Sequence, residues 1–136
     1  MRVLIAEDDL ISRKILSKFL APYGETVLAA HGDEALKLYE EAQSSGAPFD
    51  VILLDMMMPH KHGLEVLEII RRKEREAGTA SSVPILMLTG QGDAIQINQA
   101  KTLGISDYML KPVDEMKLIR ELQRLELITD PQDQWK

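Results

Sequence analysis

The chain of 136 residues contains no cysteine. Thiolate catalysis, disulfide bonds and cysteine-ligated zinc or iron–sulfur sites are therefore excluded, and a reducing, cytoplasmic setting is expected. Long apolar runs are also missing, since none approaches the roughly 20 residues that a membrane span requires. The apolar N-terminal run ends at once in three acids, Glu7, Asp8 and Asp9, so we expect neither a signal peptide nor a membrane anchor there.

Positive charge is scarce as well, because 16 Lys and Arg stand against 22 Asp and Glu, giving a net charge of −6. Phosphate backbones demand a basic surface, so direct nucleic-acid binding by this chain is not expected. What is present is a 45% hydrophobic, 28% charged composition, which is typical of a soluble globular domain. The length fits one domain with its own core. We expect that domain over residues 1–128, followed by a polar C-terminal tail at 129–136.

Short apolar runs alternate with amphipathic segments along the chain. Four of the runs lack strict alternation of apolar and polar residues, which is typical of parallel strands covered on both faces, and a fifth, more polar run suits a sheet edge. The five predicted strands are 3–6, 25–30, 51–54, 85–88 and 108–110. Apolar stripes at helical spacing predict helices in the segments that follow them, the fourth over 93–103. The pattern predicts an α/β fold with a parallel sheet and right-handed crossovers.

Local signals give further expectations about packing. Asp9 and Asp33 suit helix N-caps. The glycines that suit helix ends are Gly24, Gly46, Gly78 and Gly104. The charged run 71–76 is interpreted as a solvated helix face, and Ile15 as a core residue, whereas Ile11 fits either the core or a docking surface. No role is assigned to His31, and we expect His60 and His62 to face solvent.

Polar residues follow four of the five predicted strands, at the sheet edge where open α/β folds bind ligands. They are Glu7 and Asp8 after the first strand, Asp55 after the third, Thr89 at the end of the fourth and Lys111 after the fifth. Carboxylates from separate strands repel one another unless a hard cation such as Mg²⁺ lies among them. A lysine and a hydroxyl can bind phosphoryl oxygens, so the set predicts phosphoryl transfer. Asp55, a single acid after a buried central strand, is the predicted nucleophile, because aspartate can form an acyl phosphate.

Four segments resemble, in order and spacing, the receiver domains of two-component response regulators: LIAEDD at 4–9, LLDMMMP at 53–59, LTG at 88–90 and YMLKP at 108–112. Each segment alone is weakly specific, and the four together are strongly so. The resemblance runs from about residue 2 to about residue 126. It implies a flavodoxin-like doubly wound (βα)5 fold with strand order 2-1-3-4-5. It also implies a signalling domain that catalyses only its own phosphorylation and dephosphorylation.

The resemblance implies a role for each residue at the strand ends. Asp55 would accept a phosphoryl group from the phosphohistidine of a sensor histidine kinase or a histidine phosphotransfer protein. The implied Mg²⁺ ligands are Glu7, Asp8, Asp55 and the main-chain carbonyl of Met57. Lys111, before a cis Pro112, would contact the phosphoryl oxygens. Thr89 would move inward and Tyr108 would follow by changing rotamer, which would switch the surface around the fourth helix, fifth strand and fifth helix toward a downstream effector.

Two other functions fit part of the pattern. An aspartyl-nucleophile phosphatase would usually carry a second acid two residues after the nucleophile, where this chain has Met57. A receiver that only binds partners would not need the intact set of acids, hydroxyl and lysine. Met57 and Gln91 are expected to tune the phosphoryl lifetime. The kinase, the pathway, the oligomeric state and the output stay open, so the domain fits a stand-alone regulator or part of a larger one.

Overall fold

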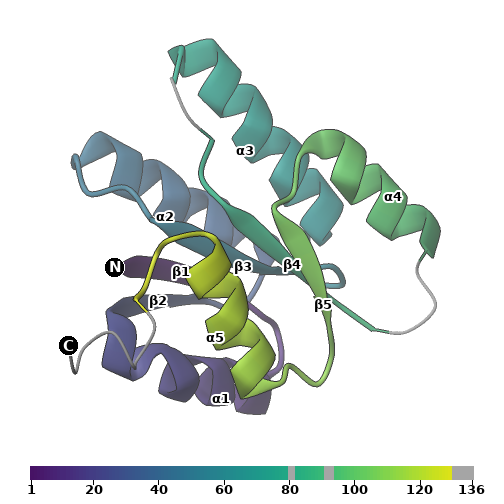
Figure 1. The fold of residues 1–136 in the computed structure, drawn as a ribbon. Helices are drawn as coiled ribbons and strands as arrows, with labels where there is room; N and C mark the ends of the chain where they lie inside the picture. The colour runs from purple at the N-terminus through teal and green to yellow at the C-terminus, as the bar shows by residue number, and fades with distance from the viewer. Residues whose placement is uncertain (80–81, 91–93, 130–136) are drawn as a thin grey trace.

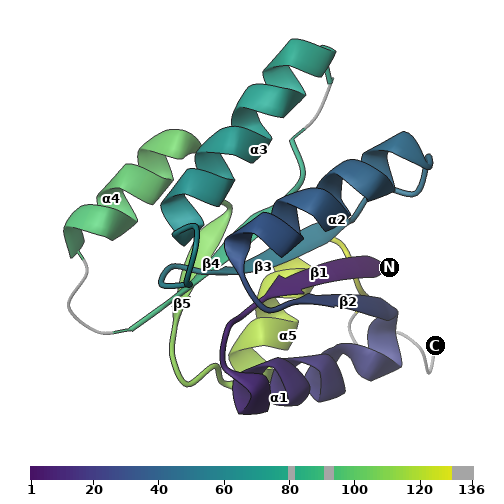
Figure 2. The ribbon, with the colours of Figure 1, turned by 180° about the vertical axis from the view of Figure 1, so that it is seen from behind.

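The computed structural model describes residues 1–79, 82–90 and 94–129. Within them a central sheet is covered on both faces, with α1 and α5 on one side and α2, α3 and α4 on the other (Figures 1 and 2). The strands are β1 (Arg2–Ala6), β2 (Glu25–Ala29), β3 (Val51–Asp55), β4 (Ile85–Thr89) and β5 (Asp107–Leu110). The helices are α1 (Leu10–Leu20), α2 (Gly32–Ser44), α3 (Gly63–Ala77), α4 (Ala94–Leu103) and α5 (Glu115–Arg124), with a 3-10 turn η1 (Ala21–Tyr23) after α1.

The sheet is parallel throughout, in the order β2-β1-β3-β4-β5. The predicted fold class and strand order are therefore confirmed, and the strands begin and end within one residue of their predicted bounds. Residue 93, where the fourth helix was expected to begin, lies outside the described residues.

Two apolar clusters, one on each face of the sheet, make up the core. Val3 and Ile5 of β1 pack with α1 and α5, while Leu4 and Ala6 of the same strand pack with α2, α3 and α4. Because alternate residues serve opposite clusters, the central strands β3 and β4 are buried along their whole length. This two-sided burial explains why the apolar runs in the sequence do not alternate.

The N-cap prediction holds for α1 and fails for α2. The Asp9 carboxylate accepts hydrogen bonds from the amide of Ser12 at 2.9 Å and from its hydroxyl at 2.8 Å. At α2 the cap is His31, whose Nδ1 accepts the amide proton of Glu34 at 3.2 Å. Asp33 lies inside the first turn, where its negative charge interacts favourably with the positive end of the helix dipole. Its carboxylate also forms an ion pair with Lys61 at 3.2 Å.

The predicted helix ends agree with the structure. Gly24 follows η1, and the glycines after α2, α3 and α4 adopt positive φ angles: Gly46, Gly78 and Gly104. Gly78 is the left-handed C-cap of α3, and its amide donates to the carbonyls of Arg75 and Glu74.

The prediction that residues 71–76 form a solvated face is wrong for two of them. Arg71 and Glu74 are each only 7% exposed and form a 2.7 Å ion pair. They continue the buried stripe of α3 at helical spacing after Leu67, so they face the protein instead of the solvent. Arg72 and Glu76 do form the expected exposed i,i+4 pair, at 3.8 Å.

The prediction that Ile15 belongs to the core is also wrong. Ile15 is 45% exposed and Ile11 is 67% exposed, whereas Leu16 and Leu20 of the same helix are buried against the sheet. A rotation of one residue along a helix moves a side chain by about 100°, so apolar neighbours of buried positions can stand outside the contact. His60 and His62 are exposed, as predicted. In the described part of the chain, no helix is both long and apolar enough to cross a bilayer.

Candidate functional site at the carboxyl edge of the sheet

Three carboxylates from two neighbouring strands meet at the carboxyl edge of the sheet. Ala6 pairs with Leu54 in the register of β1 and β3, so Glu7 and Asp55 each come next along adjacent strands. Oxygen atoms of Glu7, Asp8 and Asp55 all lie within 4.8 Å of one another. Glu7 and Asp55 are each 1% exposed, whereas Asp8 faces solvent. Two of the acids therefore lie buried at the bottom of the site, and the third lies at its open side.

A lysine from the far end of the sequence reaches the same acids. The ammonium of Lys111 lies 2.7 Å from Oδ1 of Asp55 and 2.9 Å from Oε2 of Glu7. Its amide donates to the carbonyl of Thr89 at 2.8 Å, which joins the residue after β5 to the end of β4. The Lys111–Pro112 peptide bond is cis, as expected.

The charges at this edge are not balanced. Burial raises the pKa of Asp55 to about 7; the hydrogen bond from Lys111 opposes that rise, and the neighbouring Glu7 and Asp8 add to it. Burial would lower the pKa of Lys111, but its bonds to Asp55 and Glu7 raise it above the ordinary value. Oδ2 of Asp55 is buried and has no hydrogen-bond partner among the described residues. One ammonium among three acids and an orphaned oxygen form a donor set that fits a hard divalent cation.

The other predicted site residues lie around this cluster. The amide of Met57 donates to Oδ1 of Asp55 at 3.2 Å, and its side chain is 52% exposed. Thr89 is fully buried at the end of β4, and its hydroxyl donates to the carbonyl of Gly90 at 3.1 Å. Tyr108 is half-buried on β5 and packs against the cluster of α2, α3 and α4. Gln91 lies outside the described residues.

Two residues that support the site escaped the sequence-based reasoning. Nη1 of Arg13 donates to the carbonyl of Glu7 at 2.9 Å and to that of Asp8 at 3.2 Å, which braces the loop between β1 and α1. A Cβ on Gly63 would lie 2.3 Å from the carbonyl oxygen of Asp55, so only glycine lets α3 begin beneath the acid. The cation one turn into α1 was a usable signal for Arg13; nothing local distinguished Gly63.

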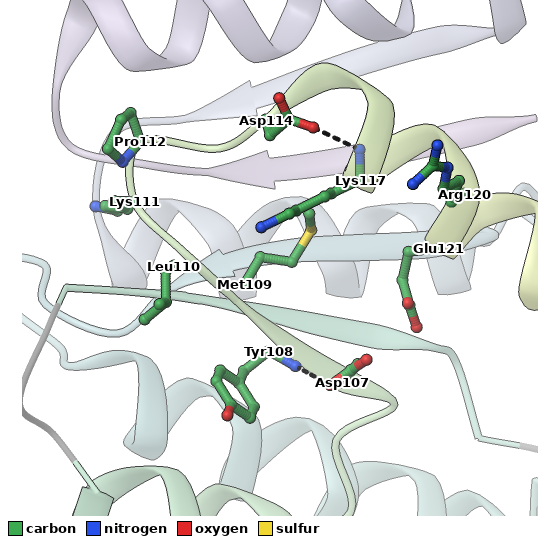
Figure 3. Close-up of a pocket in the computed structure, with 10 residues that line it drawn as sticks. All are labelled: Asp107, Tyr108, Met109, Leu110, Lys111, Pro112, Asp114, Lys117, Arg120 and Glu121. Carbon is green, nitrogen blue, oxygen red and sulfur yellow. Dashed lines mark hydrogen bonds between the residues drawn. The ribbon is translucent and has the colours of Figure 1, made fainter.

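Two grooves include Lys111 in their lining. One, of about 290 Å³, lies between α1 and the segment after Lys111 and is lined mainly by apolar side chains: Ile15, Leu16, Phe19, Leu88, Pro112 and Val113, with Glu7, Ser12 and Lys111. The other, of about 520 Å³, runs along β5 and α5 (Figure 3). Its charged lining residues are Asp107, Lys111, Asp114, Lys117, Arg120 and Glu121. The exposed Ile15 thus lines a groove beside the acids.

A sequence model described as the response regulator receiver domain matches residues 3–123. The chain belongs to the response regulator receiver domain family. The predicted resemblance is thereby confirmed, and the chain is a receiver domain of two-component signalling.

Curated and solved relatives agree with the family assignment. The chain is 33% identical over 122 residues to the Regulator of RpoS from Escherichia coli K12, covering 89% of this chain and 33% of that protein. It therefore spans about a third of the length of this relative. It is 33% identical to the Vibrio cholerae chemotaxis protein CheY4, with a TM-score of 0.75 over 90% of this chain and 96% of that one.

A third relative comes from a complex. In the co-crystal structure of the Saccharomyces cerevisiae histidine phosphotransfer signaling protein Ypd1 with the receiver domain of its downstream response regulator Ssk1, one chain is 28% identical to this protein. The match has a TM-score of 0.82 and covers 100% of this chain and 97% of that one.

Proposed function

We propose that this receiver domain accepts a phosphoryl group on Asp55 from the phosphohistidine of a sensor histidine kinase or a histidine phosphotransfer protein. The observation that carries the proposal is the buried Asp55 carboxylate, with one oxygen held by Lys111 at 2.7 Å and the other without a partner among the described residues. In the proposed reaction a carboxylate oxygen forms the new P–O bond. The P–N bond breaks, and the donor histidine leaves as imidazole.

A divalent cation belongs to this proposal. Glu7, Asp8 and Asp55 would hold Mg²⁺, with the main-chain carbonyl of Met57 as a further ligand. Bound there, the ion would neutralise negative charge on the phosphoryl oxygens and on the acids themselves. The three acids support the assignment because their pooled charge exceeds what Lys111 alone neutralises.

We assign Lys111 a role in the same reaction. Its ammonium touches both Asp55 and Glu7, so it stands where negative charge gathers during transfer. After transfer, the phosphoryl oxygens would offer the ammonium a stronger partner than the carboxylate it holds here. Lys111 would then bind the phosphoryl group and hold the phosphorylated arrangement in place.

Switching is proposed to begin at Thr89. In this structure its hydroxyl donates to the neighbouring carbonyl of Gly90, which is a local bond that a phosphoryl oxygen could replace. An inward movement of Thr89 would free space for Tyr108, and the surface formed by α4, β5 and α5 would change with it. The groove along β5 and α5 supports this surface as the contact for a downstream effector protein or domain.

The phosphohistidine partner is proposed to dock over the apolar groove beside α1. This groove includes Lys111 and Glu7 in its lining, so an occupant would lie directly next to Asp55. Exposed Ile11 and Ile15 extend the apolar surface along α1. The yeast complex of a related receiver with Ypd1 supports a phosphotransfer protein as one class of partner.

The domain limits are part of the proposal. Leu125, Leu127 and Ile128 pack, partly buried, against the cluster of α1 and α5, which supports a folded unit over residues 1–128. Of the proposed polar tail at 129–136, residues 130–136 lie outside the described residues. We propose that this unit acts in the cytoplasm, as a signalling module that catalyses only its own phosphorylation and dephosphorylation, without binding nucleic acid directly.

The test is the mass of the intact protein after incubation with acetyl phosphate and Mg²⁺. We expect one added phosphoryl group in the wild type, and none after Asp55→Asn or when EDTA replaces Mg²⁺. Asp33→Asn is the matched control, because it makes the same chemical change at an exposed acid of α2 and should leave the adduct intact. An adduct that survives Asp55→Asn would refute the assignment of the nucleophile.

A further inference from the structure

A lysine of α4 lies over the ring of Tyr108. The ammonium of Lys101 is 5.5 Å from the ring centroid, within the range of a cation–π contact. Lys101 belongs to the last turn of α4 and is exposed, whereas Tyr108 is half-buried on β5. The contact therefore joins two of the elements whose surface is proposed to switch.

Hydrogen bonds at the end of α4 hold the backbone of Lys101 in this place. Arg71 of α3 donates from Nε and Nη2 to the carbonyl of Gly104, at 3.2 and 2.8 Å. The amide of Gly104 donates in turn to the carbonyl of Lys101 at 3.1 Å. Because Arg71 is itself buried and paired with Glu74, the C-terminal end of α4 is fixed to α3. The backbone of Lys101 cannot move away from Tyr108 without breaking these bonds.

The ring of Tyr108 lies next to the positive charge of Lys101. Among the ion pairs and side-chain hydrogen bonds of residues 1–79, 82–90 and 94–129, none includes its ammonium. In Figure 3 the side chain of Tyr108 lies near the start of β5, whereas Lys111 follows the end of the strand. The contact thus belongs to the ring position seen in this structure.

We propose that Lys101 is a positioning residue that holds Tyr108 in its resting rotamer and so sets how readily phosphorylation switches the α4–β5–α5 surface. The inference rests on the proposed function, because it takes Asp55 as the phosphoryl acceptor and Tyr108 as the residue that responds. A ring that turns toward Thr89 leaves the ammonium behind and loses the contact. Lys101 therefore favours the resting state by about two- to fivefold, the effect of one exposed cation–π contact.

The experiment uses the full chain carrying 3-fluorotyrosine, followed by fluorine NMR. Tyr108→Phe assigns the Tyr108 signal, and beryllofluoride with Mg²⁺ serves as the phosphoryl analogue. Lys101→Met removes the charge and keeps an unbranched apolar stem, while Lys101→Arg keeps a cation over the ring and is the matched control. We expect Lys101→Met to lower the beryllofluoride concentration at half-conversion by about two- to fivefold, and Lys101→Arg to leave it unchanged.

Two further measurements distinguish the possible failures. Without beryllofluoride, Lys101→Met should already move the Tyr108 signal and Lys101→Arg should not; no difference between the two variants would overturn the contact. The second measurement uses a Tyr108→Leu background. Phosphorylation is followed there by the mass of the adduct formed with acetyl phosphate, a readout that needs no tyrosine signal. There Lys101→Met should have no effect on the adduct, and an effect that persists would overturn action through the ring. A wild-type protein that ignores beryllofluoride would instead refute the proposed function, while the resting signal would still decide whether Lys101 holds the ring.

Discussion

Removing the charge of Asp55 should stabilise the metal-free protein. The native state raises the pKa of this acid from 3.8 to about 7, first because burial desolvates the carboxylate. The folded protein therefore binds the proton more tightly than the unfolded chain does. Stability from this group is fully present below about pH 4 and is lost as the pH rises through about 7. Asp55→Asn abolishes that loss, because the amide stays neutral at every pH.

The magnitude follows from the size of the shift. A change of about three pKa units corresponds to an upper limit of roughly 4 kcal/mol at pH 8. That shift already includes the opposing bond from Lys111, and the neighbourhood relaxes around the charge, so we expect about 2 kcal/mol. The group is 1% exposed, which leaves little screening by solvent.

Urea unfolding of wild type and Asp55→Asn in EDTA, at several values between pH 4 and 9, measures this difference. The advantage of the variant should grow from pH 4 to 7 and then level off. Mg²⁺ should reduce it at pH 8 by stabilising the wild type through binding to the native state. A variant that is no more stable than wild type at pH 8, or an advantage independent of pH, would refute the reasoning about desolvation. The exposed Asp33→Asn should show neither trend.

Three further contacts described above can be tested by substitution. Arg71→Met should lower the free energy of unfolding by about 3 kcal/mol, because it leaves Glu74 buried without its cation, and the double change with Glu74→Met should restore much of that loss; thermal melts compare the two. Gly63→Ala should slow the acetyl phosphate reaction, because the added Cβ meets the Asp55 carbonyl; an unchanged rate would contradict the close approach. His31→Ala should cost about 1 kcal/mol in urea unfolding and His31→Asn much less, because asparagine can still cap α2.

Most of the fold was predictable because it depends on short-range patterns that burial enforces. The apolar run before Asp55, in which apolar and polar residues do not alternate, indicated a strand covered on both faces, and β3 is buried throughout. The meeting of Glu7, Asp55 and Lys111 was predictable for a related reason. Parallel strands bring their carboxyl ends to one edge, so a polar residue after each strand is carried there by the topology.

The failures have a different physical origin. Whether Ile15 or Leu16 faces the sheet depends on the rotation of α1 against it, and both choices satisfy the apolar pattern. Arg71 looked solvated because charged residues seldom lie inside, yet the carbonyl of Gly104 and the carboxylate of Glu74 satisfy it there. Gly104 follows a different helix, α4, so no signal local to α3 indicated that Arg71 would be satisfied in a buried position.

The ion pair between Glu7 and Lys111 joins residues that are 104 positions apart in the chain. During synthesis Glu7 leaves the ribosome 104 residues before its counter-ion. A partly made chain that already pairs β1 with β3 therefore carries its acids without the lysine, and like-charge repulsion opposes early closure of that edge. The last strand completes the sheet and brings Lys111 to the acids in one step, so a receiver able to take a phosphoryl group is one whose synthesis has passed β5.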